Sequence, residues 1–245
     1  MKSSLTINLS QETVEKLNQG NFTLCCFLAS KSDNALSCFP LCWNTFTKNF
    51  LKSILIEWEF DLSAYLSTSP ISDNAVIYIP QPQKSIPKQS ARFTVKKSVS
   101  GSNDKIELNQ RMLIEDYGKI TIDTNNTSPN VLIQNNSTDS YSTGICVYSS
   151  DDDQYYGTCA FTLYGGNTIS VAPVNKMFVM FSNKNIQNNT VISLSENQGL
   201  LIDFSGSNDN LRTVSYDINL GWSSNNQPWG TKIPARTFLS TILVS

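Results

Sequence analysis

The sequence predicts an all-β protein built from two tandem antiparallel β-sandwich modules, with one short N-terminal helix. Short apolar or alternating segments recur along the chain and are separated by turn-forming residues, a pattern typical of sandwiches. Helical periodicity is confined to a region near the N-terminus. An internal repeat divides the predicted strands into two copies. A single large β-barrel is the alternative architecture.

The repeat is clearest between residues 65–77 (YLSTSPISDNAVI) and residues 180–192 (MFSNKNIQNNTVI). Ile71 and Ile186, 115 residues apart, are one of five identical pairs that share this separation, and Gln83 and Gln198 extend the match. A copied unit of this size is large enough to form its own core.

The boundaries of the modules follow from this repeat and from composition. Residues 124–140 (TNNTSPNVLIQNNSTDS) are rich in turn formers around only three consecutive apolar residues. We therefore expect module 1 over 1–124, a linker over 125–140 and module 2 over 141–245.

The first elements are predicted from local patterns. Residues 4–10 alternate apolar and polar, as in a strand with one buried face. Ser10 can cap a following helix, which Gly20 would end. Residues 22–29 indicate a buried strand, and residues 54–60 (ILIEWEF) alternate cleanly.

The remaining strands are predicted from shorter apolar segments. In the first module we expect them over residues 75–79, 92–98, 106–108, 112–115 and 119–123. In the second we expect them over residues 144–149, 158–164, 168–171, 177–181, 190–194, 200–204, 212–220 and 238–244. The GSND sequence at 101–104, found again at 206–209, indicates a hairpin turn.

Composition excludes several classes of function. The chain has 18 basic and 20 acidic residues without a basic cluster, so we expect no nucleic-acid partner. It has no histidine, which excludes Ser-His-Asp, Cys-His and His-metal chemistry. Charged residues make up only 16%, so the polar surface must come from Asn, Ser and Thr. Such a surface suits sugar recognition or packing into ordered assemblies.

The N-terminal residues lack the apolar core of a signal peptide, and no segment has the length of a membrane span. We therefore expect no transmembrane segment, and a protein that is cytoplasmic or released without a classical signal peptide.

The six cysteines allow two interpretations. Cys26 with Cys38, and Cys146 with Cys159, enclose similar polar stretches and could form one disulfide in each module. The favoured alternative is that all six are small buried hydrophobic residues in a reducing compartment.

The first candidate site is the turn with Asp151, Asp152 and Asp153, followed by Tyr155 and Tyr156. Carboxylates on one loop can bind calcium, and tyrosines can stack on a sugar ring. The alternative is a charged hairpin tip that prevents edge pairing. Calcium is the only cofactor we consider.

The second candidate site is the C-terminal loop with Trp222, Asn225, Asn226 and Trp229. Two indoles among amide side chains are suited to a carbohydrate. The alternative is that Trp222 fills the core while Trp229 packs against a neighbouring proline.

These features favour a non-enzymatic, lectin-like protein that binds a carbohydrate or another polar ligand through its loops. A self-assembling, inclusion-forming or membrane-active protein is the alternative, and a homo-oligomer is compatible with both. The last hypothesis is a histidine-free enzyme that acts through a shaped hydrophobic cavity.

Overall fold

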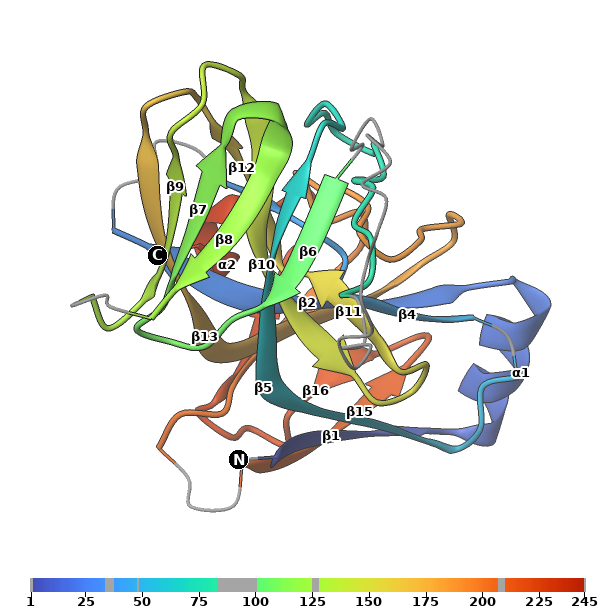
Figure 1. Cartoon of the computed structure of the whole chain (residues 1–245). Coiled ribbons are helices and arrows are strands. Elements are labelled where there is room, and N and C mark those ends of the chain that lie inside the picture. The colour runs from blue at the N-terminus through green and yellow to red at the C-terminus, as the bar shows by residue number, and fades with distance from the viewer. Residues whose placement is uncertain are drawn as a thin grey trace.

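The computed structural model describes residues 2–33, 38–47, 49–82, 101–124, 128–206 and 210–244. This part of the chain is mostly β-structure, arranged in two curled sheets (Figure 1). The helices are α1 (Gln11–Gln19), the four-residue α2 (Ser240–Leu243) and a single 3-10 turn, η1 (Asp116–Gly118). The all-β class predicted from the sequence is confirmed.

The first sheet contains nine strands of the described chain. Its order is β16 (Gly221–Ser223), β15 (Leu211–Asp217), β1 (Lys2–Leu9), β5 (Ser53–Ser67), β10 (Tyr141–Ser149), β12 (Cys159–Leu163) and β3 (Phe39–Pro40). Two further strands lie off this path: β11 (Gln154–Gly157) pairs with β10, and β6 (Gly101–Lys105) pairs with β5.

The second sheet contains eight of the described strands. Its order is β17 (Gly230–Ile233), β14 (Gly199–Asp203), β13 (Thr168–Ser182), β9 (Val131–Asn135), β7 (Arg111–Glu115) and β8 (Lys119–Asp123). Off this path, β2 (Thr23–Ser32) pairs with β13 and with β4 (Asn44–Thr47).

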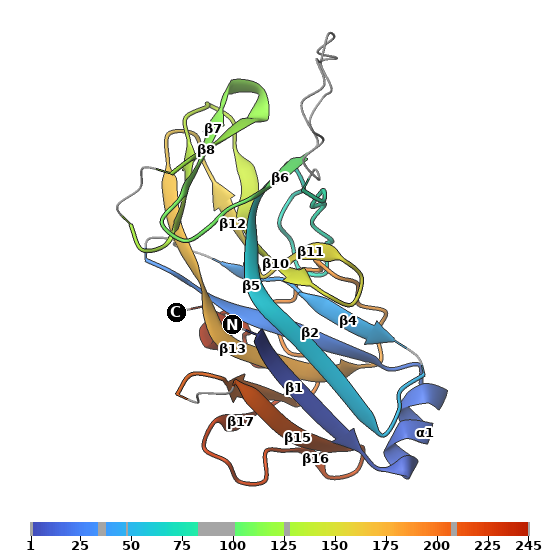
Figure 2. The same ribbon diagram turned by 60° about the horizontal axis from the view of Figure 1, so that its bottom comes forward.

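Strands from both halves of the chain share each sheet (Figure 2). In the first sheet β5 lies between β1 and β10, and in the second β13 pairs with both β2 and β9. The range 125–140, expected to be a linker, contains the internal strand β9.

The same set of pairings occurs in both sheets. The two longest strands, β5 and β13, each have 15 residues and start 115 residues apart. β1 pairs antiparallel with β5 and parallel with β15, while β9 pairs antiparallel with β13 and parallel with β7. The partners β15 and β7 are each the first strand of a hairpin, β15–β16 and β7–β8. The parallel pairs differ from the purely antiparallel sheets that we expected.

The loops after the two long strands also correspond. Asn74 and Asn189, 115 residues apart, both have positive φ, at 63° and 64°. The loops lie side by side, because the backbone N–H of Asn74 donates to the Val191 carbonyl and that of Ile77 to the Asn189 carbonyl. Residues 75–79 and 190–194, where strands were expected, are therefore loop with only isolated bridges.

The main core lies between the inner faces of the sheets. It combines Ile54, Ile56 and Trp58 of β5 with inward side chains of the second sheet. The Trp58 ring meets Phe204 edge-on at 4.8 Å between centroids. The alternation of residues 54–60 is thus confirmed, with Leu55 and Glu59 exposed on the other face.

The predicted N-terminal helix is confirmed as α1. The Ser10 hydroxyl accepts the Thr13 N–H at 3.2 Å, and the N–H of Gly20 closes the last turn on the Lys16 carbonyl. Leu17 is fully buried, which attaches the helix to the core at the end of β1.

Three other expectations differ from the structure. Residues 238–244 include the helix α2 rather than a strand, because Leu239 and Leu243 pack on the outer face of β2 and β13. Residues 101–104 belong to β6 rather than to a turn. None of the described strands covers 106–108, where a strand was expected. Gln83 and the strand expected over 92–98 lie outside the described residues.

All six cysteines are buried, and none is in a disulfide. Cys26 lies on β2 in the second sheet, whereas Cys38 directly precedes β3 in the first. Burial raises the pKa of the Cys26 thiol well above its ordinary value, so that thiol is protonated and unreactive. The disulfides considered for Cys26–Cys38 and Cys146–Cys159 are not formed, in agreement with the favoured buried-thiol interpretation.

Candidate functional site

Trp222 is part of the core. Its side chain is fully buried between Phe181, whose ring stacks at 5.5 Å, and Tyr216, whose ring centroid is 4.8 Å away. The indole N–H donates to the Gln198 carbonyl at 3.2 Å. The ring therefore has no open face for a ligand, and its position is the core alternative weighed for this residue.

The rest of the C-terminal loop is more exposed. Asn225 and Asn226 lie at the surface, with φ values of 54° and 60° that suit a tight turn. Trp229 is half-buried and covers the guanidinium of Arg212, which lies 5.1 Å from its ring centroid. Arg212 itself is buried, and its guanidinium also lies 5.8 Å from the Phe204 ring centroid. One face of Trp229 thus has a structural role.

The three carboxylates of the hairpin over 151–156 do not point to one common site, because each is bonded to a different partner. Asp151 accepts a hydrogen bond from the Asn44 amide at 3.1 Å, Asp152 accepts one from the Tyr156 hydroxyl, and Asp153 accepts one from the Tyr148 hydroxyl at 2.7 Å. Among the described residues, no group of three or more acidic or cysteine side chains is placed to hold a metal ion.

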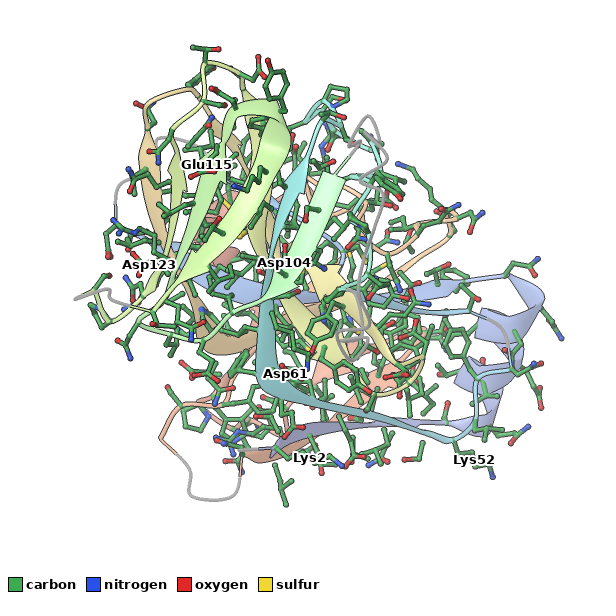
Figure 3. The ribbon with its side chains drawn as sticks, in the orientation of Figure 1. Lys2, Lys52, Asp61, Asp104, Glu115 and Asp123 are labelled. Carbon is green, nitrogen blue, oxygen red and sulfur yellow. The ribbon has the colours of Figure 1, made fainter. Side chains whose placement is uncertain are left out.

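Tyr155 belongs to a neighbouring polar cluster that sequence reasoning missed. Its hydroxyl donates to Asp61 at 2.7 Å, and Lys105 pairs with the same carboxylate at 3.2 Å. The Gln81 amide makes two hydrogen bonds to the backbone of Tyr155. Figure 3 labels Asp61 on β5. These groups satisfy one another, so the cluster holds β11 and the loop after β5 together.

The two candidate loops are not neighbours in the first sheet, because β15, β1 and β5 separate β16 from β10. The strand order therefore does not bring the tryptophan-bearing loop and the aspartate-bearing hairpin to one site.

A pocket of about 460 Å³ opens beside the Trp222-bearing strand. It is formed by the end of β1, the start of α1, the β15–β16 hairpin and Lys232 of β17. The lining residues are Asn8, Leu9, Ser10, Ser215, Tyr216, Asp217, Leu220, Gly221, Trp222, Ser223 and Lys232.

Strand alternation decides which side chains this pocket presents. Leu9 and Trp222 are buried in the core, so their neighbours Asn8 and Ser223 point to the outer face of the sheet. Ser215 is directly opposite both Asn8 and Ser223 and shares that face. The pocket therefore offers one amide and several hydroxyl groups, with the exposed Leu220 at its edge.

Asp217 provides a fixed negative charge in the pocket. Its Oδ1 accepts the backbone N–H groups of Asn219 at 2.9 Å and Leu220 at 3.1 Å, while Ser10 and Thr13 donate to Oδ2 at 3.4 and 3.3 Å. These bonds, above all the one from the Asn219 N–H, hold the pKa of the carboxyl below its ordinary value. The N-terminus of α1 favours the same charge.

The Asp217 bonds predict a pH-dependent effect of Asp217→Asn. Because the folded pKa is depressed, the ionised carboxylate stabilises the protein above the unfolded pKa, and this stability is lost as pH falls through the folded pKa. We expect the variant to melt below the wild type at neutral pH, and the gap to close in acid. Melting temperatures across a pH series test this; a gap that is the same at every pH would contradict it.

Two smaller pockets differ in chemistry. One of about 400 Å³ is lined by residues of the 45–54 region, and one of about 350 Å³ is lined by mixed charges such as Glu196 and Arg236. Sequence reasoning found the Trp222 loop but missed Asn8, Ser215 and Asp217. The outward position of Asn8 and the Asp-Ile-Asn-Leu-Gly turn at 217–221 were the available signals.

No protein-family model, curated protein or solved structure matches this chain. No helix among the described residues has both the length and the apolar character needed to span a lipid bilayer.

Proposed function

We propose that the protein is a non-enzymatic, lectin-like binding protein that takes a neutral carbohydrate in the pocket between β1, the β15–β16 hairpin and Lys232. The observation that carries this proposal is the chemistry of the lining. Asn8, Ser215 and Ser223 offer uncharged donors and acceptors on the outer face, in a pocket of about 460 Å³. Pockets of this size with a few convergent polar groups are typical of small-molecule sites.

The charged groups of the lining have different roles. The Asp217 carboxylate already accepts four hydrogen bonds from the protein, two on each oxygen, so it fixes the shape of the 217–221 turn at the pocket wall rather than binding the ligand. Lys232 is an exposed donor on the second sheet, and Leu220 supplies an apolar contact for the C–H groups of a sugar. The single cation of the lining gives little support for a polyanionic ligand.

A glycan array followed by calorimetry with the best-binding sugar tests this function. Ser223→Trp would fill the pocket from an edge strand, and we expect it to weaken binding at least about tenfold, equivalent to about 1.4 kcal/mol. Thr121→Trp is the matched control, because Thr121 lies opposite Leu113 in the β7–β8 hairpin as Ser223 lies opposite Ser215. Equal binding by both variants and the wild type, or no glycan bound by the wild type, would contradict the proposal.

We further propose that the two halves arose by tandem duplication and exchange strands with each other. The support is the set of corresponding registers: Ile7 is opposite Ile54 in the first sheet, and Ile133 is opposite Ile169 in the second. On this proposal the second copy begins with β9, and each copy supplies β1 or β9 to one sheet and β2 or β10 to the other.

A further inference from the structure

A row of uncharged polar side chains leads out of the pocket across four strands. Ser223 is directly opposite Ser215, Ser215 is opposite Asn8, and Asn8 is opposite Ser53. Neighbouring strands lie about 4.8 Å apart, so the four positions span about 14 Å. We call these four residues the outer-face row.

The row joins two hollows in the surface. Ser223, Ser215 and Asn8 line the pocket of about 460 Å³, and Ser53 lines the pocket of about 400 Å³ at the 45–54 region. The proposed site is therefore longer than the first pocket, and the row is the direct path between the two hollows.

The side chains of the row are available to a ligand. Those of Asn8, Ser215 and Ser53 make no hydrogen bond to any other residue in the described part of the chain, while Ser223 only accepts the Asn225 N–H at 3.1 Å. Asn8 and Ser53 are exposed, and Ser215 and Ser223 are partly exposed.

Charged groups flank the uncharged positions on this face: Glu57 and Glu59 follow Leu55 along the same side of β5, and Lys52 directly precedes Ser53. Lys2 and Lys52 lie at opposite ends of the β1–β5 pair (Figure 3). Lys2 is already paired with Glu57 at 2.9 Å. The next row on this face, formed by Thr213, Thr6 and Leu55, is also uncharged. This electrostatically neutral strip matches a neutral ligand rich in hydroxyl groups.

The corresponding row of the other sheet lacks these properties. Its positions are Thr121, Leu113, Gln134 and Thr168, in the same pairing order. Leu113 interrupts the polar sequence, and the Gln134 amide is engaged by Arg111 at 3.2 Å and Asn136 at 2.7 Å. That row is therefore an internal control.

From these observations we infer that the ligand is a linear neutral oligosaccharide, with one end in the pocket and its following units along the outer-face row to Ser53. This inference rests on the proposed function and adds the length and direction of the ligand. Each further unit gains hydrogen bonds from the row, until the ligand passes Ser53.

The test is calorimetry with mono- to hexasaccharides of the neutral cello-, xylo-, manno-, malto- and chito- series. In the series that binds, affinity should rise with length and then reach a plateau. Ser53→Ala should weaken binding of the longest member about three- to tenfold, as expected for one hydrogen bond, and Ser53→Trp should do so more strongly. Both variants should leave binding of the monosaccharide unchanged.

Thr168→Trp in the control row should bind every length as the wild type does. A monosaccharide that binds as tightly as the hexasaccharide would overturn the extended site and leave the pocket intact. Unchanged binding of the longest member by both Ser53 variants would overturn it in the same way. Failure of every series to bind at any length would overturn the proposed function itself.

Discussion

Replacing Trp222 with alanine is expected to lower the free energy of unfolding by about 3–5 kcal/mol. The indole is fully buried, stacks on Phe181, packs against the tilted ring of Tyr216, and donates its N–H to the Gln198 carbonyl. Its removal leaves a cavity between the two sheets and a carbonyl without its partner. Urea unfolding followed by circular dichroism measures the loss.

Trp229→Ala is the matched comparison. This indole is half-buried, and its ring lies over the Arg212 guanidinium. We therefore expect its removal to lower the free energy of unfolding by less than about 2 kcal/mol. If the Trp222 variant were as stable as the Trp229 variant, the assignment of Trp222 to the core would be contradicted.

Dividing the chain into fragments 1–127 and 128–245 is expected to leave neither fragment able to fold alone. In the first fragment β5 loses β10 and β1 loses β15; in the second, β13 loses β2 and β9 loses β7. Each sheet is thus missing internal pairings and half of its core. Mixed at equal concentration, the fragments should form one compact complex with a cooperative unfolding transition.

Size-exclusion chromatography and circular dichroism of the separate and mixed fragments provide the measurement, with the intact chain as reference. Independent modules side by side would give the opposite result. A cooperative transition of fragment 128–245 alone would therefore contradict the strand exchange.

The helix α1 and the edge strand β8 were predictable because their signals are local. Ser10 and Gly20 mark the ends of α1, and β8 has the bounds expected for residues 119–123. β9 was not predictable, because its few apolar residues are followed by Gln134 and Asn135. Asn135 is nevertheless fully buried, since its amide donates to the carbonyls of Asp139 and Leu163. A local sequence pattern does not reveal such tertiary hydrogen-bond partners.

The strand predicted over 238–244, where the structure has the helix α2, was wrong for a related reason. Residues 238–244 are apolar and β-branched, which favours a strand, but Leu239 and Leu243 are both buried where they cover Phe27 and Phe178 on the outer face of the second sheet. A short segment takes the conformation that best covers this surface.

The pocket proposed as the binding site adjoins the Trp222 loop, but Asn8, Ser215 and Asp217 of its lining were not singled out from the sequence. Sequence pattern placed Trp222 on a loop, whereas the pairing of Tyr216 with Trp222 and of Ser215 with Ser223 directs the indole inward and the hydroxyls outward. This orientation depends on long-range register, which joins residues 8, 53, 215 and 223 only in the folded sheet.

The most direct test of the binding site is the pattern of amide chemical-shift changes when the isotope-labelled protein is titrated with the best-binding neutral oligosaccharide. The changes should concentrate at residues 8–10 and 215–223 and extend to Ser53, with the β7–β8 hairpin unaffected. Changes confined to residues 151–156 or 225–229, or no change with any neutral glycan, would contradict the account.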